Sequence, residues 1–296
     1  MTRFIDYNFD SKFCTVNGHE MHYLDEGEGE VLLMLHGNPS WSFYYRHFVN
    51  TLKEQYRCIV PDHIGMGLSA RPGEEDYPFT LDRRVDDLSV LLDSLNVKDN
   101  ISLIVHDWGG MIGMTYASRF PDRIKRLIIM NTVAFHLPKT KSIPWQLKLS
   151  RIPFLNKVLN QGLNAFCVGA TIQCVTRNSM SREVKQGYLA PYDSWDNRLA
   201  VRRFVEDIPL NEQHVSFKTV DHVDKNLHQF VDVPKLICWG LKDFVFDKAF
   251  YNEWQRRFPD AECHAFPDVG HYIAEDAPDL VLPLIKNFLV LHPLSS

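Results

Sequence analysis

The stretch Ile101-Ser-Leu-Ile-Val-His-Asp-Trp-Gly-Gly-Met111 decides the fold. It starts as an apolar run typical of a strand buried on both faces, ends in polar residues and enters a helix through two glycines. This order matches a nucleophile elbow, in which small residues flank the nucleophile because a strained turn brings the neighbouring backbone close. Asp107 holds the nucleophile's position, Gly109 is the second small residue, and Val105 replaces the first glycine. The pattern alone fits equally well an aspartate that merely caps the following helix.

Strand-like apolar runs alternate with helical patterns through the first half of the chain, which is typical of βαβ units and a largely parallel sheet. Asn17-Gly18 is expected to form the turn of an opening hairpin. A helix capped by Thr80 should carry the apolar residues between Val85 and Leu95, and a second helix should cover Met111–Arg119. The expected strands are Phe13–Val16, Glu20–Asp25, Val31–Leu35, Cys58–Pro61, Ile101–His106, Leu127–Met130, Lys235–Trp239 and Glu262–Ala265.

Residues 131–234 separate two expected parallel strands that one helix would normally connect, so we expect an insertion there. Helical patterns over Trp145–Leu159, Arg182–Leu189 and Asn197–Glu206 predict an ordered helical cap and not a linker. The sequence thus predicts an α/β core of residues 1–130 and 235–296 with a cap of residues 131–234. The apolar cap residues either line a hydrophobic channel or, for most of them, form the packing faces of cap helices. They include Ile143, Trp145, Leu147, Leu149, Phe154, Leu155, Leu159, Phe166 and Val168.

The composition excludes several classes of protein. Basic and acidic residues number 32 and 37 and are mixed along the chain, so with a formal charge of −5 no nucleic-acid partner is expected. No apolar run reaches the roughly 20 residues of a transmembrane helix, and the N-terminus lacks a signal-peptide pattern, so we predict a cytoplasmic protein. The six cysteines form no C-x-x-C or zinc pattern, and Cys58 and Cys238 are expected to be buried thiols. Neither a metal nor an organic cofactor is expected.

Polar motifs follow three further strands, and together they favour catalysis over helix capping. His36-Gly37-Asn38-Pro39 follows one strand, where this architecture places a loop that donates an oxyanion-hole N–H, although a simple Gly-Pro turn is the alternative. Asp243 and His271 follow the last two strands and offer an acid and a base. The chain order nucleophile, acid, histidine is that of this fold class. We therefore predict Asp107 as the nucleophile, His271 as the base and Asp243 as its orienting acid.

These residues resemble those of the α/β-hydrolase superfamily and, within it, the haloalkane dehalogenase family. The resemblance covers essentially the whole chain: besides the elbow and the terminal histidine it includes His36–Pro39, Pro61–Ser69, Tyr188–Tyr192 and Arg202–Pro209. It implies an α/β-hydrolase fold, in which helices flank a mostly parallel central sheet and a helical cap is inserted.

The same resemblance implies particular roles at the site. Asn38 and Trp108 would donate side-chain N–H groups to a leaving halide. The position after the sixth strand is Asn131 and not a carboxylate. The chain is therefore similar to the family branch that combines an Asp-His-Asp triad, with Asp243 as the acid, and an Asn-Trp halide site.

A second resemblance is at least as close over the full length. Trp41–Arg46, Ala134–Pro138 and Ile237–Phe246 look like segments of the β-lactone decarboxylases of bacterial long-chain olefin biosynthesis. Both families use the same constellation, so two activities stay open. The principal expectation is displacement of halide from a haloalkane, with the alkyl-enzyme ester hydrolysed by water that His271 activates. The alternative is decarboxylation of a β-lactone to an alkene.

Two other functions are also compatible with the sequence. Epoxide hydrolysis would need a cap acid, for which Tyr188 and Tyr192 are available, and a non-catalytic receptor for a small ligand is the other option. The implied partners are a small apolar substrate, either haloalkane or β-lactone, and a halide ion. A homo-oligomer or an assembly with enzymes of the olefin pathway is also compatible with the resemblance.

Overall fold

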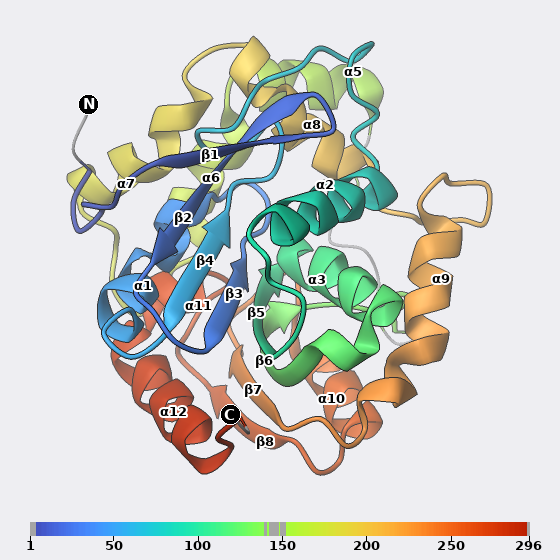
Figure 1. The fold of residues 1–296 in the computed structure, drawn as a ribbon. Helices are drawn as coiled ribbons and strands as arrows, with labels where there is room; N and C mark the ends of the chain where they lie inside the picture. Colours follow the sequence, from blue (N-terminus) through green and yellow to red (C-terminus); the bar gives the residue numbers. More distant parts are fainter. Residues whose placement is uncertain (1–3, 139–140, 142–147, 149–151, 295–296) are drawn as a thin grey trace.

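The computed structural model describes residues 4–138, 141, 148 and 152–294, and its centre is an eight-stranded sheet (Figure 1). The strand order is β1-β2-β4-β3-β5-β6-β7-β8. β1 and β2 form an antiparallel hairpin, β2 pairs antiparallel with β4, and the other neighbours are parallel. The strands are β1 (Lys12–Val16), β2 (His19–Glu26), β3 (Val31–Leu35), β4 (Arg57–Pro61), β5 (Ile101–Asp107), β6 (Ile124–Thr132), β7 (Lys235–Gly240) and β8 (Glu262–Phe266). All eight expected strands are confirmed.

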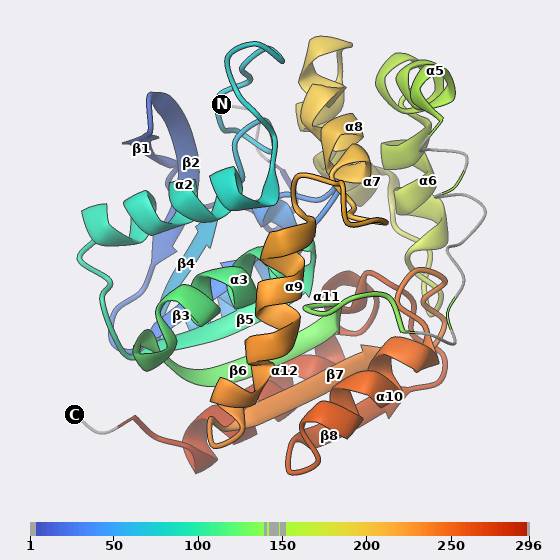
Figure 2. The same ribbon diagram turned by 90° about the vertical axis from the view of Figure 1, so that its right-hand side faces the viewer.

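Helices cover both faces of the sheet (Figures 1 and 2). On one face, α3 (Trp108–Arg119) packs against β3, β5 and β6 and lies between α2 (Leu81–Ser94) and α9 (Phe217–Asn226). On the other face, α1 (Arg46–Leu52) packs against α12 (Pro278–Leu291). Between β7 and the C-terminus lie α10 (Lys248–Arg257) and the short α11 (Ile273–Asp276), and the 3-10 helix η1 (Ser42–Tyr45) precedes α1.

The connection between β6 and β7 leaves the sheet and returns through α9. Figures 1 and 2 both place the helices that precede α9 in this connection at the end of the molecule opposite α12. These helices are α5 (Pro153–Asn156), a π-helical segment (Lys157–Gly162), α6 (Ala165–Gln173), α7 (Arg182–Leu189) and α8 (Leu199–Glu206). They lie on the side of the molecule where the helices that follow β3 and β5 begin.

Local sequence explains the elements that matter for the site. Every residue of β5 is buried, as a strand covered by helices on both faces requires. The Thr80 side chain accepts a hydrogen bond from the Arg83 N–H at the start of α2, which confirms the predicted cap. Asn17 and Gly18 both have positive φ, 46° and 90°, in the predicted hairpin turn.

The predicted cap helices need one correction. Ile152 is extended, with φ −73° and ψ 114°, because the residue before a proline is driven out of the helical region, so α5 begins only at Pro153. The expected continuous helix over Trp145–Leu159 is therefore wrong at this point. Most of its first half, with Trp145 and Leu147, lies outside the described residues, as do Ile143 and Leu149. α6 and α9 were not predicted at all.

The cysteines follow the prediction where they lie in strands. Cys58 and Cys238 are fully buried, and Cys167 and Cys174 are buried in the segment between β6 and β7. Cys14 and Cys263 are partly exposed, because they lie on the two outermost strands of the sheet, β1 and β8.

Candidate active site

Asp107 occupies a strained turn between β5 and α3. Its φ of 51° and ψ of −128° lie in a region that residues with a side chain rarely adopt, and such strain is common at functional positions. The turn brings backbone segments so close that a Cβ on Gly109 would collide with the Leu35 carbonyl oxygen. A Cβ on Gly37 would collide with the Asp107 carboxylate itself. The geometry of the turn is that of a nucleophile elbow.

The Asp107 carboxylate is buried and held by backbone donors. The Asn38 N–H donates to its Oδ1 at 2.7 Å, and the Trp108 N–H also bonds to the carboxylate. Its Oδ2 lies 3.6 Å from Nε2 of His271. One oxygen is thus fixed by the loop after β3, and the other faces the imidazole.

His271 lies between two carboxylates. Its Nδ1 is 2.7 Å from Oδ2 of Asp243, which follows β7, while its Nε2 faces Asp107. The other oxygen of Asp243, Oδ1, accepts hydrogen bonds from the N–H groups of Val245 and Phe246, at 2.7 and 3.0 Å. The ends of β5, β7 and β8 therefore bring together the three residues predicted from the strand-end motifs.

Burial and charge pull the pKa values of this group in opposite directions. Burial raises the pKa of Asp107 above its usual value, although His271 and the two N–H donors oppose the shift. Burial lowers the pKa of His271, but the attraction of Asp243 and then of Asp107 outweighs it and leaves the pKa raised. The arrangement therefore favours a charged imidazole beside a carboxylate that is more basic than an exposed one.

Asn131 is a member of the site that sequence reasoning did not place. Its Nδ2 donates to Oδ2 of Asp243 at 2.9 Å and to the Gly240 carbonyl at 3.0 Å, and its Oδ1 accepts from the Gly240 N–H at 2.8 Å. The amide thus fixes the loop that carries Asp243. Its sequence signal is its place directly after the expected strand Leu127–Met130; in the structure it lies within β6.

A cavity of about 440 Å³ opens onto Asp107 and His271. Asn38 and Trp108 line it beside them, and Asp243 lies behind His271. Most of its remaining wall is apolar and comes from both the core and the helices between β6 and β7. This wall includes Met111, Phe135, Leu159, Phe166, Ala170, Val205, Ile208, Val220, Phe244 and Phe246. Leu159 and Phe166 thus line the cavity, whereas Phe154 is exposed to solvent.

The two side chains expected to bind a leaving group are held differently. Nδ2 of Asn38 donates to the Val201 carbonyl of α8 at 3.1 Å, so this amide also ties the loop to the helix above it. The Trp108 ring packs against Phe204 of the same helix, with ring centroids 5.3 Å apart. Its indole N–H has no acceptor among the described residues, whereas the Asn38 amide keeps one further N–H.

The tyrosines considered for epoxide chemistry are engaged elsewhere. The Tyr188 hydroxyl donates to Glu275 at 2.8 Å, and the Tyr192 hydroxyl donates to the Ser40 carbonyl at 3.0 Å. Neither is among the described residues that line the cavity. Epoxide hydrolysis through either tyrosine is therefore not supported by this geometry.

No cluster of three His, Cys, Asp or Glu side chains suited to a metal ion occurs in the described ranges. Likewise, the described helices include none with the length and apolar character needed to cross a bilayer.

A strained acidic elbow on a mostly parallel sheet, followed by an acid and a histidine at later strand ends, defines an α/β hydrolase. The family model for the alpha/beta hydrolase fold matches residues 30–278, and the chain belongs to this family. Its fold is similar to haloalkane dehalogenase DatA from Agrobacterium tumefaciens, with a TM-score of 0.85 and 23% identity over 96% of this chain and 97% of that one.

Relatives of known name lie closer in sequence. A cis-3-alkyl-4-alkyloxetan-2-one decarboxylase from Shewanella oneidensis is 53% identical over 95% of this chain and 88% of its own length. One of the same name from Xanthomonas campestris is 45% identical over 97% and 98%. Haloalkane dehalogenase 2 from Mycobacterium tuberculosis is 30% identical over 95% and 96%. These homologues support an enzyme, and both families named from the sequence are found among them.

We predict that Asp243→Asn lowers the pKa of His271, because it removes the largest attraction that raises it. Asn131→Ala should leave the pKa of His271 raised, since the Asp243 charge stays in place. An NMR titration of the imidazole resonances would measure both values. Equal decreases in the two variants would mean that Asn131, and not the Asp243 charge, sets the ionisation of His271.

Proposed function

We propose that this chain is a decarboxylase of cis-3,4-dialkyl β-lactones with Asp107 as its nucleophile. The observation that carries the proposal is similarity over nearly the whole chain, 53% and 45% to two proteins named for that activity against 30% to a dehalogenase. An oxetan-2-one is a four-membered cyclic ester, that is, a β-lactone. The apolar cavity that ends at Asp107 suits a substrate with two alkyl chains. Halide displacement, our first expectation from the sequence, becomes the second candidate.

The first step is attack by Oδ2 of Asp107 on the ring carbon that carries the 4-alkyl group. The ring C4–O bond breaks, ring strain is released, and the product is an enzyme ester whose alkyl group carries a free carboxylate. A carboxylate can attack without a general base because it is already anionic. Oδ1 stays on the Asn38 N–H while Oδ2 faces His271, so Oδ2 is the oxygen that would react.

The second step breaks the bond between C3 and the new carboxylate. Its electron pair forms the C3=C4 double bond, carbon dioxide leaves, and the C4–O bond to Asp107 breaks to regenerate the aspartate. No proton is added or removed in either step. The side-chain N–H groups of Asn38 and Trp108 would steady the ring carboxylate as charge develops on it, and a protonated His271 would stabilise departing Asp107.

Residues 131–234 would act as the cap that closes this cavity, since Leu159, Phe166 and Ala170 contribute to its wall. An apolar enclosure excludes water, which favours elimination over hydrolysis of the ester. The proposed partner is a small apolar substrate. Cytoplasmic location and assembly with a second copy or with enzymes of an olefin pathway stay predictions.

The His271→Gln variant separates the two chemistries. With a β-lactone it should continue through many turnovers at a reduced rate, because neither step transfers a proton. With a 1-bromoalkane it should release about one equivalent of bromide and then stall as an alkyl ester, since hydrolysis needs the base. Gas chromatography of the alkene, halide assay and intact mass would measure these outcomes.

Peptide mapping of the stalled enzyme should place the alkyl group on Asp107, and Asp107→Ala should give neither alkene nor adduct while remaining folded. A single equivalent of alkene from His271→Gln would contradict ring opening at C4. Full activity of Asp107→Ala on both substrates would contradict the whole proposal.

The pH dependence should also differ between substrates. For the β-lactone, kcat/KM should rise with pH as Asp107 loses its proton, with a midpoint above the ordinary aspartate value of 3.8, because burial raises its pKa. For the haloalkane, kcat should rise again at a midpoint above 6.5, since His271 must lose its proton and its pKa is raised. Rate profiles from pH 4 to 9 would test this. A midpoint above 6.5 for the lactone would assign His271 a base role there.

Haloalkane hydrolysis is retained as a second candidate because the Trp108 indole N–H has no acceptor among the described residues and lines the cavity. Trp108→Phe removes this donor and keeps an aromatic ring. Halide release should fall on the order of 10²-fold, as when one oxyanion-hole donor is lost. Phe166→Leu, a change elsewhere in the cavity wall, is the control and should have a much smaller effect. Equal losses in the two variants would assign Trp108 a packing role only.

A further inference from the structure

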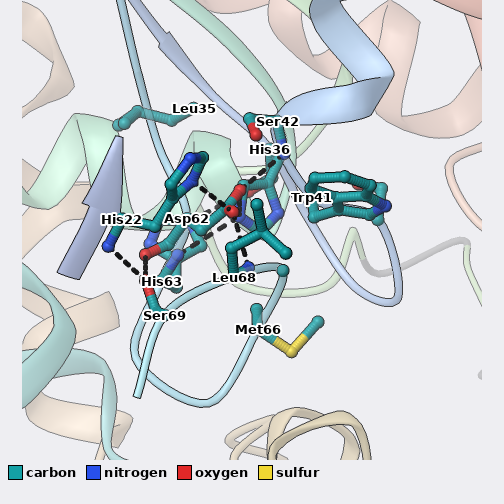
Figure 3. Close-up of polar contacts among 12 residues, drawn as sticks. His22, Leu35, His36, Trp41, Ser42, Asp62, His63, Met66, Leu68 and Ser69 are labelled. Carbon is teal, nitrogen blue, oxygen red and sulfur yellow. Dashed lines mark hydrogen bonds and ion pairs between the residues drawn. The ribbon is translucent and has the colours of Figure 1, made fainter. Parts of the chain in front are cut away.

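A cluster of buried polar side chains lies beside the loop that carries Asn38. At its centre is Asp62, which directly follows β4 and is 0% exposed. Figure 3 shows three donors around its carboxylate. The Ser42 N–H donates to Oδ1 at 2.6 Å, while Nδ1 of His22 and the Leu68 N–H donate to Oδ2, each at 2.8 Å. The site described above uses none of these interactions directly.

The backbone is shaped to fit this carboxylate. Gly67 has a φ of 52°, and a Cβ at this position would collide with the Asp62 side chain. A buried carboxylate is stable only when its oxygens receive hydrogen bonds, and such charge-assisted bonds are about twice as strong as neutral ones. The segment from Asp62 to Ser69 therefore encloses a fixed carboxylate, which holds the residues around it in place through hydrogen bonds.

His63 is bonded to the beginning of the loop that carries Asn38, at His36. Its backbone N–H donates to Nε2 of His36 at 3.3 Å, and its own Nε2 donates to the His36 carbonyl at 3.0 Å. Nδ1 of His36 donates to the Gly37 carbonyl at 2.8 Å. Because one ring nitrogen of His36 accepts and the other donates, this ring is neutral, and burial lowers its pKa accordingly.

The loop from His36 to Ser42 is thus fixed at its first residue by His63 and at its last by Asp62. β3 and β4 are parallel neighbours, so the residues that follow them meet at one edge of the sheet. Between the two fixed points lies Asn38, whose N–H donates to Asp107. We infer that Asp62 and His63 are positioning residues that set the Asn38 N–H against the Asp107 carboxylate. This inference rests on the proposed role of Asp107 as nucleophile.

Ser42 offers a way to break this coupling and leave Asp62 in place. Ser42→Pro removes the N–H that Asp62 accepts, at the first position of a 3-10 helix. Trp41 before it is already extended, with φ −153° and ψ −174°, as a residue before proline prefers. Ser42→Ala is the matched control, because it keeps the N–H and loses only the hydroxyl bonded to Tyr7.

We expect Ser42→Pro to lower kcat for alkene formation on the order of 10- to 10²-fold with little change in KM, as a small displacement of a catalytic donor would. The acid limb of kcat/KM should also move to higher pH. The Asn38 N–H lowers the pKa of Asp107, so weakening it lets that pKa rise further. Ser42→Ala should show neither change. A variant that only loses stability would leave the acid limb where it is.

Asp62→Asn provides a second test, in which the two possible roles of Asp62 predict pH shifts in opposite directions. If Asp62 acts through the loop, the acid limb moves to higher pH, as in Ser42→Pro. If it acts only by its charge, removing an anion makes ionisation of Asp107 easier and moves the limb to lower pH. Asp87→Asn is the matched control, because Asp87 is another fully buried carboxylate that binds Asn17 and Tyr77 away from the loop.

An unmoved or lowered acid limb in both Ser42→Pro and Asp62→Asn, with both variants folded, would overturn the inference. So would a shift of the same size in Asp87→Asn or Ser42→Ala. Asp107→Ala separates this failure from failure of the proposed function. If that variant stays active, the nucleophile assignment is wrong; if it is inactive while the limb stays fixed, only the positioning role is wrong.

Discussion

The buried carboxylate of Asp107 is the interaction on which the rest of the site depends. A carboxylate withdrawn from water needs hydrogen bonds, and two of them come from backbone N–H groups that the strained elbow and the loop after β3 place around it. That approach requires glycine at positions 37 and 109. His271, which follows β8, further offsets the cost of burying this negative charge. Fold and site are therefore coupled, because each donor stands at the end of a strand.

A carboxylate in this position favours displacement at saturated carbon. Unlike a serine, it needs no base to become a nucleophile. Burial raises the pKa of the carboxylate and so keeps it basic, while the N–H donors fix its orientation. In the proposed function the first step would be the same for a haloalkane and for a β-lactone: a C–O bond to Asp107 would form while a group that takes negative charge departs. Such a shared step would account for the similarity of this chain, over nearly its whole length, to proteins named for two different reactions.

The sequence predicted much of this arrangement because its signals are local. Asp107 ends an apolar run, and Asp243 and His271 lie in polar motifs that follow the last two, so the sequence placed all three near strand ends; parallel strand ends share one edge of a sheet. Asn131 was missed as a positioning residue because its contacts with Gly240 and Asp243 join segments over a hundred residues apart. The Asp62 cluster was missed because its donors come from three separate segments, at His22, Ser42 and Leu68, that no local pattern connects.

The segment between β6 and β7 was less predictable than the rest of the chain. Its helices are short, and α5 begins only at Pro153 and continues directly as a π-helical segment, so no long periodic pattern marks them. Their cavity-facing residues are set by packing against the core. Periodicity alone could not separate a channel wall such as Leu159 from an exposed side chain such as Phe154.

The choice between hydrolysis and decarboxylation follows from the intermediate rather than from the residues around Asp107. An ester formed from a β-lactone carries a carboxylate next to the ester carbon, and loss of carbon dioxide expels Asp107 without any other reactant. An ester formed from a haloalkane lacks that carboxylate and must wait for a water molecule at His271. In the proposed function one set of groups would serve both outcomes, so discrimination would lie in which molecule reaches Asp107. The apolar walls that line the cavity, from the core and from the helices between β6 and β7, would then make that selection.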